Sequence, residues 1–517
     1  MKQGLNNDPP TQNDTTYLPG YEAQLSTSGV HHSIQKLQLA SQELTSTSSS
    51  PEKDGTIVET IIYLPCSSEE ETIGYRCCCS FQILTRECKT TQRVQYCYAM
   101  RHAKTAMAIE SDSFPIATPR IQNVMKSILH ALNDHDGTNP FENLGRDLTS
   151  ISFASSWHEE GACIVTLNYS IPLPRSSCDG GDSSKKWHAL QLEGRKLCTS
   201  CSITSLMLRS KKRQIVLGQN PPYLLDCLLL QKSAVHDSPL PRIQFSLVSP
   251  DKMNLLMEQE EEMVDGSSSL VIYHKPHDAF QHPNSNTMLQ ALHWMMDTLQ
   301  NILSNYSSKR TPLNLLEMYC GCGAHTMAIA KAGLFDSIVA VELDQRLVDA
   351  CSRNCHLNGV DYKDGTDLTV REEHKEGDHP VGEDTRKVGL NCDRTTVYPF
   401  QGDAGRWASK YLRTTTSTTT QKEPNVQNQS YWYAQSYQVL LVDPPRMGLD
   451  ENVRNLAIHG PFDHIIYVSC GRNALKRDLV ILGKHFDVMD CVLTDLFPRT
   501  DSVETLVHLR RKHICSS

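Results

Sequence analysis

Two short apolar stretches near the C-terminal end of the chain each lead to a side chain that can do chemistry. Val439–Val442 is followed directly by Asp443. Ile465–Val468 is followed, after one serine, by Cys470. The length and β-branched content of both stretches predict buried parallel strands, and ligands of open α/β sheets bind beyond the carboxyl ends of such strands. We therefore expect a carboxylate and a thiol in one crevice.

Each of these residues also has an ordinary structural explanation. The two prolines that follow Asp443 could simply end a strand, and a single buried cysteine is usually inert. A cysteine beside a ligand crevice is instead a candidate nucleophile. From the residues alone, the inert and the nucleophilic interpretation of Cys470 stand about even.

A glycine turn predicts where a cofactor would bind. Within Glu317-Met-Tyr-Cys-Gly-Cys-Gly323, Gly321 and Gly323 permit close approach of a ligand to the backbone. Glu342 ends the next predicted strand, where it could accept hydrogen bonds from ribose hydroxyls. The third glycine of a dinucleotide site would fall at Thr326, which weakens that interpretation. S-adenosylmethionine fits at least as well, and a glycine turn without a ligand is the common alternative.

The elements around these residues predict an α/β domain at residues 274–517. Asn284 or its neighbours cap a predicted helix with one apolar face. Strand, helix and strand patterns then follow in the order of a βαβ unit, at residues 313–319, 326–332 and 338–341. Two polar stretches, at about 361–394 and 414–430, are predicted surface insertions because they cannot bury much apolar surface.

The preceding region predicts a domain of another kind. Residues 55–273 have short, β-rich apolar runs and one amphipathic helix at 121–132, which indicates an α+β domain on an antiparallel sheet. Residues of about 172–240 read as an insertion with limited structure of its own. Residues 1–54 are rich in Ser, Thr, Asn, Gln and Pro, which predicts a mostly disordered tail with one short helix.

Composition and charge narrow the class of protein. A chain of 517 residues should hold more than one domain. A net charge of −9 argues against a protein that coats nucleic acid by bulk electrostatics, but not against RNA binding by a local patch. No stretch approaches the ~18 apolar residues of a membrane span, and the N-terminus has no signal pattern. We expect no membrane partner and a cytoplasmic location, with a nuclear or organellar one left open.

The cysteines predict reduced thiols. Nineteen cysteines are unevenly spaced in a long chain without a secretory signal, which disfavours a disulfide framework. One CxxC pair, Cys198 and Cys201, has no second pair and no histidine pair at ligand spacing. We therefore expect no metal site.

Together, and in this order, the motifs of the C-terminal domain resemble the tRNA (uracil-5-)-methyltransferase family. The motifs are Phe280-Gln-His-Pro-Asn284, Leu316-Glu-Met-Tyr-Cys-Gly321, Asp443-Pro-Pro-Arg-Met-Gly-Leu-Asp450, Tyr467-Val-Ser-Cys470, Leu496-Phe-Pro498 and Glu504. The upstream motifs resemble the bacterial-type tRNA enzymes of this family rather than their ribosomal-RNA relatives; they are Tyr21-Glu-Ala-Gln-Leu25, Tyr75-Arg76 and Asp112-Ser-Phe-Pro115. The resemblance covers most of the chain from Tyr21 to Leu509.

This resemblance implies a class I S-adenosylmethionine-dependent methyltransferase domain with a Rossmann-like α/β fold, preceded by an α+β RNA-recognition domain. The implied reaction is methylation of uridine C5 in RNA, foremost U54 of the tRNA T-loop, to give 5-methyluridine. Cys470 would be the nucleophile and Glu504 the base. The residues around the cofactor would be His282, Tyr319, Glu342 and Asp443. A monomer that binds tRNA is expected, with no metal.

Three positions depart from the family pattern. The family's cofactor-binding Gln falls at His282, its Asn after the cofactor turn at Ala324, and its Asn-Pro after the cysteine at Gly471-Arg472. Two alternatives therefore stay open: a methyltransferase that acts on ribosomal RNA, and an RNA-binding protein with impaired catalysis. In an active enzyme, a cation such as Arg446 or Arg472 would favour the thiolate of Cys470.

Overall fold

Two units of structure make up the described part of the chain. The computed structural model describes residues 28–45, 58, 60–87, 94–102, 105–109, 114–133, 139–158, 160–174, 182–233, 241–249, 251–253, 255–256, 270–279, 282–306, 312–363, 395–416 and 436–512. The first unit comprises 1–31, 72–155 and 162–222, and the second comprises 32–71, 156–161 and 223–517. The chain thus passes between the units more than once.

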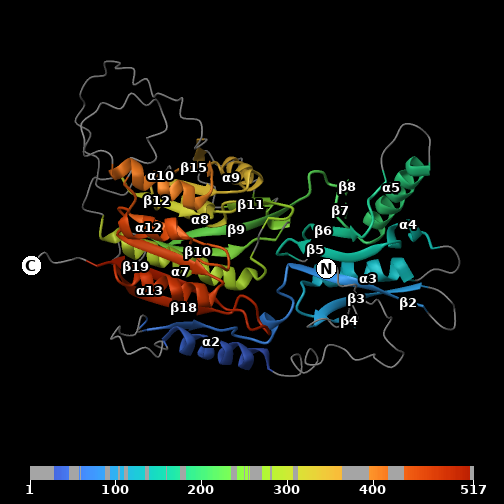
Figure 1. Ribbon diagram of the computed structural model, residues 1–517, viewed down its shortest axis with the longest axis horizontal. Helices are drawn as coiled ribbons and strands as arrows, with labels where there is room; N and C mark the ends of the chain where they lie inside the picture. The colour runs from blue at the N-terminus through green and yellow to red at the C-terminus, as the bar shows by residue number, and fades with distance from the viewer. Residues whose placement is uncertain are drawn as a thin grey trace, which may run out of the picture. The chain divides into compact units, whose positions relative to one another are not determined.

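A nine-stranded sheet forms the centre of the second unit (Figure 1). Neighbouring strands of this sheet are parallel, except that β19 is antiparallel to the strands on both sides of it. The α/β class predicted from the sequence is confirmed. In spatial order the strands are β1 (Ile62–Leu64), β18 (Phe486–Thr494), β19 (Glu504–Arg511), β17 (His464–Ser469), β16 (Val439–Val442), β12 (Asn314–Met318), β13 (Ser337–Glu342), β15 (Thr396–Gln401) and β14 (Asp361–Tyr362).

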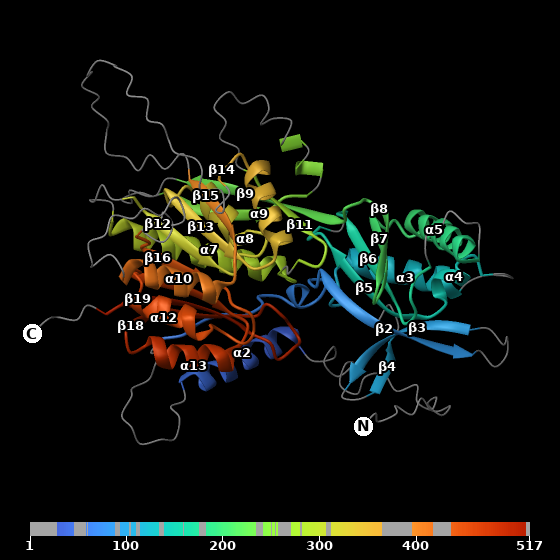
Figure 2. The same cartoon turned by 45° about the horizontal axis from the view of Figure 1, so that its top comes forward.

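Side-chain alternation buries both faces of this sheet. In β16, Leu440 and Val442 belong to one apolar core, whereas Val439 and Leu441 belong to the other. A strand covered on both faces reads as a continuous apolar run, which is why the sequence showed no alternation here. One face is covered by α7 (Ser285–Ser304), α8 (Ala324–Ala332) and α9 (Gln345–Leu357), and the other by α10 (Ala404–Thr416), α12 (Glu451–His459) and α13 (Arg472–Leu482) (Figure 2).

The order of the strands determines where a ligand crevice opens at the edge of the sheet. From β12 the chain proceeds outward to β13 and β15, and then returns to the other side of β12 to form β16 and β17. Such a reversal is a topological switch point, where the connections leave the sheet in opposite directions and open a ligand site beyond the carboxyl ends of the strands. The glycine turn follows β12, and Asp443 follows β16.

The domain boundary predicted near residue 274 differs from the observed division. A three-stranded sheet of β10 (Arg242–Leu247), β9 (Tyr223–Ser233) and β11 (Leu270–Pro276) belongs to the second unit, where its apolar face packs with α7. Asn354 of α9 and Asn358, which caps the C-terminal end of α9, bond to β11 as a strand would. Their amide oxygens accept from the backbone N–H groups of His274 and Ile272, each at 2.7 Å. Neither contact leaves a signal in local sequence.

The first unit contains a seven-stranded sheet in the order β4, β3, β2, β5, β6, β7, β8. All pairs are antiparallel except β6 with β7, as expected for an α+β domain. The strands are β2 (Cys78–Glu87), β3 (Val94–His102), β4 (Thr105–Ile109), β5 (Leu148–Ser155), β6 (Cys163–Tyr169), β7 (Ser205–Ser210) and β8 (Arg213–Gly218), and two helices pack on them, α3 (Pro119–Asn133) and α5 (Asp182–Ser200).

The expectation of limited structure at 172–240 is wrong. This segment forms α5, β7, β8 and β9. Leu190 and Leu197 of α5 pack against Leu206 of β7 in the core of the first unit. The many Ser and Lys residues that suggested an insertion share these elements with the buried residues, so composition alone underestimated the core.

The N-terminal segment contributes a longer helix than expected. The helix α2 (Gly29–Thr45) buries Leu37, Ala40 and Leu44 in the core of the second unit. It lies beside α13 and β18, from the opposite end of the chain (Figures 1 and 2). The rest of the predicted tail lies outside the described residues, apart from Ser28. The insertions predicted at about 361–394 and 414–430 also lie outside them, except for 361–363 and the end of α10. Among described residues, no helix has the length and apolar character to span a bilayer.

A pair of leucines tests whether α2 is part of the folded core. Leu37 is 0% exposed and Leu39 is 57% exposed on the same helix. We expect Leu37→Ala to lower the free energy of unfolding by about 2–5 kcal/mol because it leaves a cavity. Leu39→Ala should change it by less than about 0.5 kcal/mol. Denaturant titration of the full chain measures the free energy of unfolding of both variants. An equally small change in the two variants would place α2 outside the core.

Candidate active site

The turn after β12 has left-handed backbone conformations at three residues. Tyr319, Gly321 and Gly323 have φ values of 65°, 57° and 83°. A Cβ on Gly321 would meet no atom within 4 Å, so the space above this residue is open to a ligand. A Cβ on Gly323 would approach Sγ of Cys351 to 2.6 Å. The first glycine thus permits approach of a ligand, whereas the second permits packing of α8 against α9.

Glu342 connects the end of β13 to this turn. Its Oε2 accepts from the N–H of Gly321 at 3.0 Å, and its Oε1 accepts from the N–H of Asp344 at 2.9 Å. These bonds orient the carboxylate toward the turn. Each carboxylate oxygen keeps a further lone pair, so both bonds are compatible with the predicted contact to ribose hydroxyls.

A buried carboxyl group below the turn was not singled out from the sequence. Glu317 of β12 is 1% exposed, and its Oε2 accepts from the hydroxyl of Thr326 at 2.6 Å. Burial raises the pKa of Glu317 to about 8. Thr326 stands where a dinucleotide site would have its third glycine, and here its hydroxyl ties α8 to β12. A charged residue inside an otherwise apolar strand was the available signal.

Two histidines and Asp443 come together beside the turn. Ligand-type atoms of His282, His325 and Asp443 all lie within 4.8 Å of one another. Burial, followed by the neighbouring charge of His325, lowers the pKa of His282 to about 3, and burial lowers that of His325 to about 4. Both imidazoles are therefore neutral at physiological pH and can donate as well as accept hydrogen bonds. Such a set could hold a divalent cation or the polar end of a cofactor; the absence of a metal stays a prediction.

Register places Cys470 next to Glu504. Ser469 of β17 pairs with Thr505 of the antiparallel β19, so the next position on one strand faces the preceding position on the other. Those positions are Cys470 and Glu504. The sequence separates them by a helix and a strand, and only the pairing of β17 with β19 brings them together.

Burial shapes the electrostatics of this pair. Burial, followed by the charge of Asp443, raises the pKa of Glu504 to about 8. Burial also raises the pKa of Asp443 to about 7. Burial comes first among the effects that raise the pKa of the Cys470 thiol, followed by the charges of Glu504 and Asp443, while Arg446 lowers it. Asp443, predicted to bind the cofactor, therefore shares one electrostatic environment with the predicted nucleophile Cys470 and the predicted base Glu504.

The second arginine proposed as a partner of Cys470 lies elsewhere. Arg472 pairs with Glu43 of α2 at 3.3 Å. Arg446 is exposed and is the cation whose charge favours the Cys470 thiolate. The segment that carries Arg446 also explains a departure from the family pattern, because a Cβ on Gly471 would collide with the backbone carbonyl of Arg446. Glycine is required where these two loops touch.

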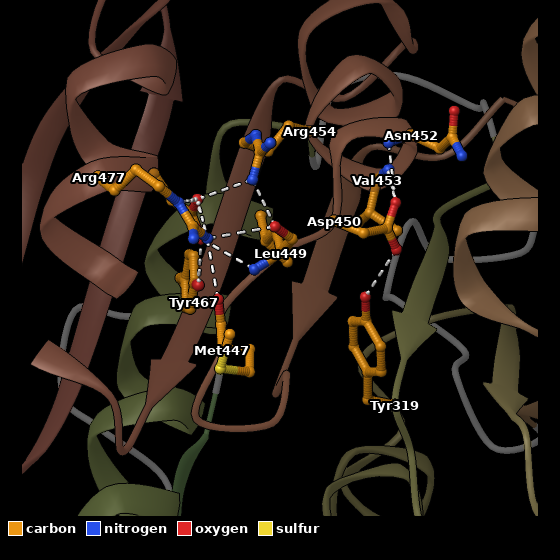
Figure 3. Close-up of polar contacts among 10 residues, drawn as sticks. Tyr319, Met447, Leu449, Asp450, Asn452, Val453, Arg454, Tyr467 and Arg477 are labelled. Atoms are coloured by element: carbon orange, nitrogen blue, oxygen red, sulfur yellow. Dashed lines mark hydrogen bonds and ion pairs between the residues drawn. The ribbon is translucent and has the colours of Figure 1, made fainter. Parts of the chain in front are cut away.

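A hydrogen-bond network fixes the Asp-Pro-Pro-Arg loop (Figure 3). Asp478 of α13 accepts from the N–H of Leu449 and from the hydroxyl of Tyr467, each at 2.8 Å. The carboxylate of Asp450 caps α12 and accepts from the hydroxyl of Tyr319 at 3.4 Å. The predicted cofactor residue Tyr319 is thereby linked to the same loop as Asp443. The structure brings all six predicted site residues to the carboxyl ends of β12, β13, β16 and β17 and to the elements next to them.

Comparison with known proteins agrees with this arrangement. The sequence profile of the family described as tRNA (Uracil-5-)-methyltransferase matches residues 245–374 and 422–512, which include the glycine turn, Asp443, Cys470 and Glu504. Over these residues the chain is similar to this family.

Relatives named tRNA/tmRNA (uracil-C(5))-methyltransferase extend the match. The protein of Colwellia psychrerythraea is 24% identical over 418 residues, which is 80% of this chain and 84% of the relative. That of a Sulfurovum species is 28% identical over 415 residues, covering 80% and 82%. The match to the protein of Aliivibrio fischeri is shorter, with 27% identity over 263 residues, or 50% of this chain and 57% of the relative.

A solved structure shows a weaker likeness. The Pyrococcus abyssi tRNA (uracil-54, C5)-methyltransferase, crystallised with S-adenosyl-L-homocysteine, has a TM-score of 0.48 and 13% identity, covering 95% of this chain and 85% of its own. The order of the strands in the nine-stranded sheet by itself identifies the α/β fold.

The titration of Cys470 tests the electrostatics of the site. Glu504→Gln removes a negative charge near the thiol and should lower the pKa of Cys470, whereas Arg446→Gln removes a positive charge and should raise it. Alkylation rates at Cys470, followed by peptide mass spectrometry across pH, give the three titration curves. The E504Q curve should lie at lower pH than the wild-type curve and the R446Q curve at higher pH. The reverse order would contradict the assigned environment.

Proposed function

We propose that this protein methylates C5 of uridine in tRNA to give 5-methyluridine, with S-adenosylmethionine as the methyl donor and U54 of the T-loop as the target. The observation that supports this most is the register of β17 against β19, because it sets a thiol and a carboxyl group side by side at the crevice. Neither group alone would suggest base modification. Together they match a reaction that adds a nucleophile to a base and later removes a proton from it.

The residues around the crevice fit the cofactor. Open space above Gly321 would accommodate a ligand against the backbone of the turn. Glu342 would accept hydrogen bonds from ribose hydroxyls, and the neutral His282 would take the place of the family's glutamine toward the polar end of the cofactor. Tyr319 and Asp443 would complete the enclosure. When bound, the cofactor supplies an electrophilic methyl group on a sulfonium ion.

Cys470 would make the base reactive. Uracil C5 is a poor nucleophile, and addition of the Cys470 thiolate at C6 pushes electron density onto C5. The raised pKa of this thiol means that only a small fraction is ionised at neutral pH, and Arg446 increases that fraction. A thiolate with a high pKa is also intrinsically more nucleophilic. The environment of Cys470 therefore lowers the ionised fraction of the thiol but raises the reactivity of the thiolate that forms.

Glu504 would end the cycle. After C5 has gained the methyl group, its proton must leave before the covalent bond to Cys470 can break. With a pKa of about 8, Glu504 is mostly protonated at neutral pH, and its ionised fraction is a much stronger base than an ordinary glutamate. The C5–H electron pair then re-forms the C5–C6 double bond, and the Cys470 thiolate leaves.

The target base must reach the crevice from a folded RNA loop. A base inside such a loop would have to be flipped out of its stack, and the RNA would have to be held elsewhere on the protein. We assign that role to the first unit. Its β7–β8 hairpin carries Arg209, Lys211, Lys212 and Arg213, a local basic group in a chain of net charge −9. A cytoplasmic location and a monomeric state stay predictions.

Loss of the thiol should abolish the reaction. Cys470→Ala is expected to give no 5-methyluridine above background in tRNA incubated with labelled cofactor. Cys198→Ala, which removes another half-buried thiol, is the matched control and should retain wild-type activity. In tRNA containing 5-fluorouridine, the wild type and C198A should form a stable covalent complex, because fluorine cannot leave as the proton does, and C470A should form none.

Two outcomes would favour the alternatives. Product in ribosomal RNA but not in tRNA would indicate the other substrate class. RNA binding without product in either RNA would indicate an impaired enzyme, in which His282 and Ala324 replace the family's usual residues. Full activity of C470A would contradict the mechanism.

Loss of the base should arrest the cycle after methyl transfer. We expect Glu504→Gln to lower turnover about 10²–10⁴-fold. Covalent protein–tRNA complexes carrying the labelled methyl group should accumulate, visible on denaturing gels with ordinary tRNA. If E504Q lowers turnover without any such complex, Glu504 does not remove the C5 proton.

A further inference from the structure

One lysine of the N-terminal helix α2 reaches into the loop between β18 and β19. The Nζ of Lys36 donates to the backbone carbonyls of Phe497 and Thr500, each at 2.8 Å, and of Ser502 at 3.0 Å. It also forms an ion pair with Asp495. Three carbonyls and one carboxylate thus surround a single ammonium group, which uses all three of its N–H donors.

This arrangement is buried. The side chain of Lys36 is 6% exposed and that of Asp495 is 0% exposed. Asp495 has a second contact, as its Oδ2 accepts from the thiol of Cys66 at 3.9 Å. A buried charge is costly unless it is paired and hydrogen-bonded, and the Lys36 ammonium is paired with Asp495 and donates to three carbonyls. The same contacts therefore stabilise the buried lysine and define one conformation of the loop.

The loop leads directly into the proposed base. β18 ends at Thr494, β19 begins at Glu504, and these two residues pair with each other. The intervening residues 495–503 are the loop that Lys36 occupies. Lys36 contacts both ends of this loop, with Asp495 and Phe497 at one end and Ser502 at the other. The carbonyl of Ser502 is two residues from Glu504, so the lysine fixes the backbone just before the carboxylate.

We propose that Lys36 is a positioning residue for Glu504, and that α2 thereby controls removal of the C5 proton. This inference rests on the proposed function. In that step the C5 proton passes to the Glu504 carboxylate, the C5–H electron pair forms the C5–C6 double bond, and the bond from C6 to Sγ of Cys470 breaks. Addition of Cys470 and transfer of the methyl group come earlier and do not use Glu504.

A purely structural role for Lys36 makes a different prediction. If the lysine only stabilised the second unit, its loss would distort or unfold that unit as a whole. Cofactor binding, adduct formation and turnover would then all decrease together. If it positions Glu504, its loss slows only the release step. The methylated covalent complex must then accumulate, because its formation outpaces its breakdown.

The test uses Lys36→Met in the full chain with ordinary tRNA and labelled cofactor. We expect cofactor affinity within twofold of wild type, an unchanged rate of complex formation on 5-fluorouridine tRNA, and turnover reduced about a hundredfold, the loss expected for a reacting group displaced by about 1 Å. Methyl-labelled covalent complex should accumulate on ordinary tRNA, as for E504Q.

Lys476→Met is the matched control. Lys476 donates to the carbonyl of Glu43 at 2.9 Å, so it also anchors α2, but at a site away from the 495–503 loop. We expect K476M to turn over at the wild-type rate without accumulating complex. Accumulation in K476M equal to that in K36M would assign the effect to loss of α2 docking in general and would overturn the specific role of Lys36.

A double variant covers the case in which K36M folds poorly, since it leaves Asp495 buried without its cation. Lys36→Met with Asp495→Asn removes both charges and should recover thermal stability, yet it lacks donors for the three carbonyls and should still accumulate complex. Wild-type turnover in the folded double variant, or proportional loss of all three measured steps, would overturn the proposal. Absence of 5-methyluridine from the wild type would instead contradict the proposed function itself.

Discussion

The site depends on the insertion of one antiparallel strand, β19, between β17 and β18. Parallel strands all present the same end to the crevice, so a sheet made only of parallel strands would bring the start of no strand to that edge. Because β19 runs the other way, its first residue, Glu504, lies beside Cys470, which follows the last residue of β17. A thiol and a carboxyl group far apart in sequence become neighbours through backbone pairing alone.

Burial then gives these groups their chemical character. The same exclusion of water raises the pKa values of Glu504 and Asp443 and lowers that of His282. Carboxyl groups become stronger bases and imidazoles become neutral hydrogen-bonding groups. Fixed charges in this low-dielectric unit require dedicated partners. Lys36 with Asp495 is one such arrangement, and it adds a constraint on the loop before Glu504 to the electrostatic pairing.

The two glycine positions of the site illustrate two different constraints. Gly321 leaves space open on the side where a ligand would approach, whereas Gly471 allows the backbone of Arg446 to pass close to the residue after Cys470. The second constraint explains in physical terms why a side chain is absent there. It is a packing requirement between two loops, and the sequence of either loop alone does not reveal it.

The sequence by itself determined the local elements and the chemistry of single residues. The apolar runs before Asp443 and Cys470, the cap at Asn284 and the glycine turn all depend on interactions within a few residues, which a linear pattern records. The role of Glu504 came only from family resemblance. Tertiary structure decided the structured state of α5 and β7, the place of β9–β11 in the second unit, and the contact of Lys36 with the 495–503 loop. These features arise from contacts between distant segments, and spacing along the chain carries no information about them.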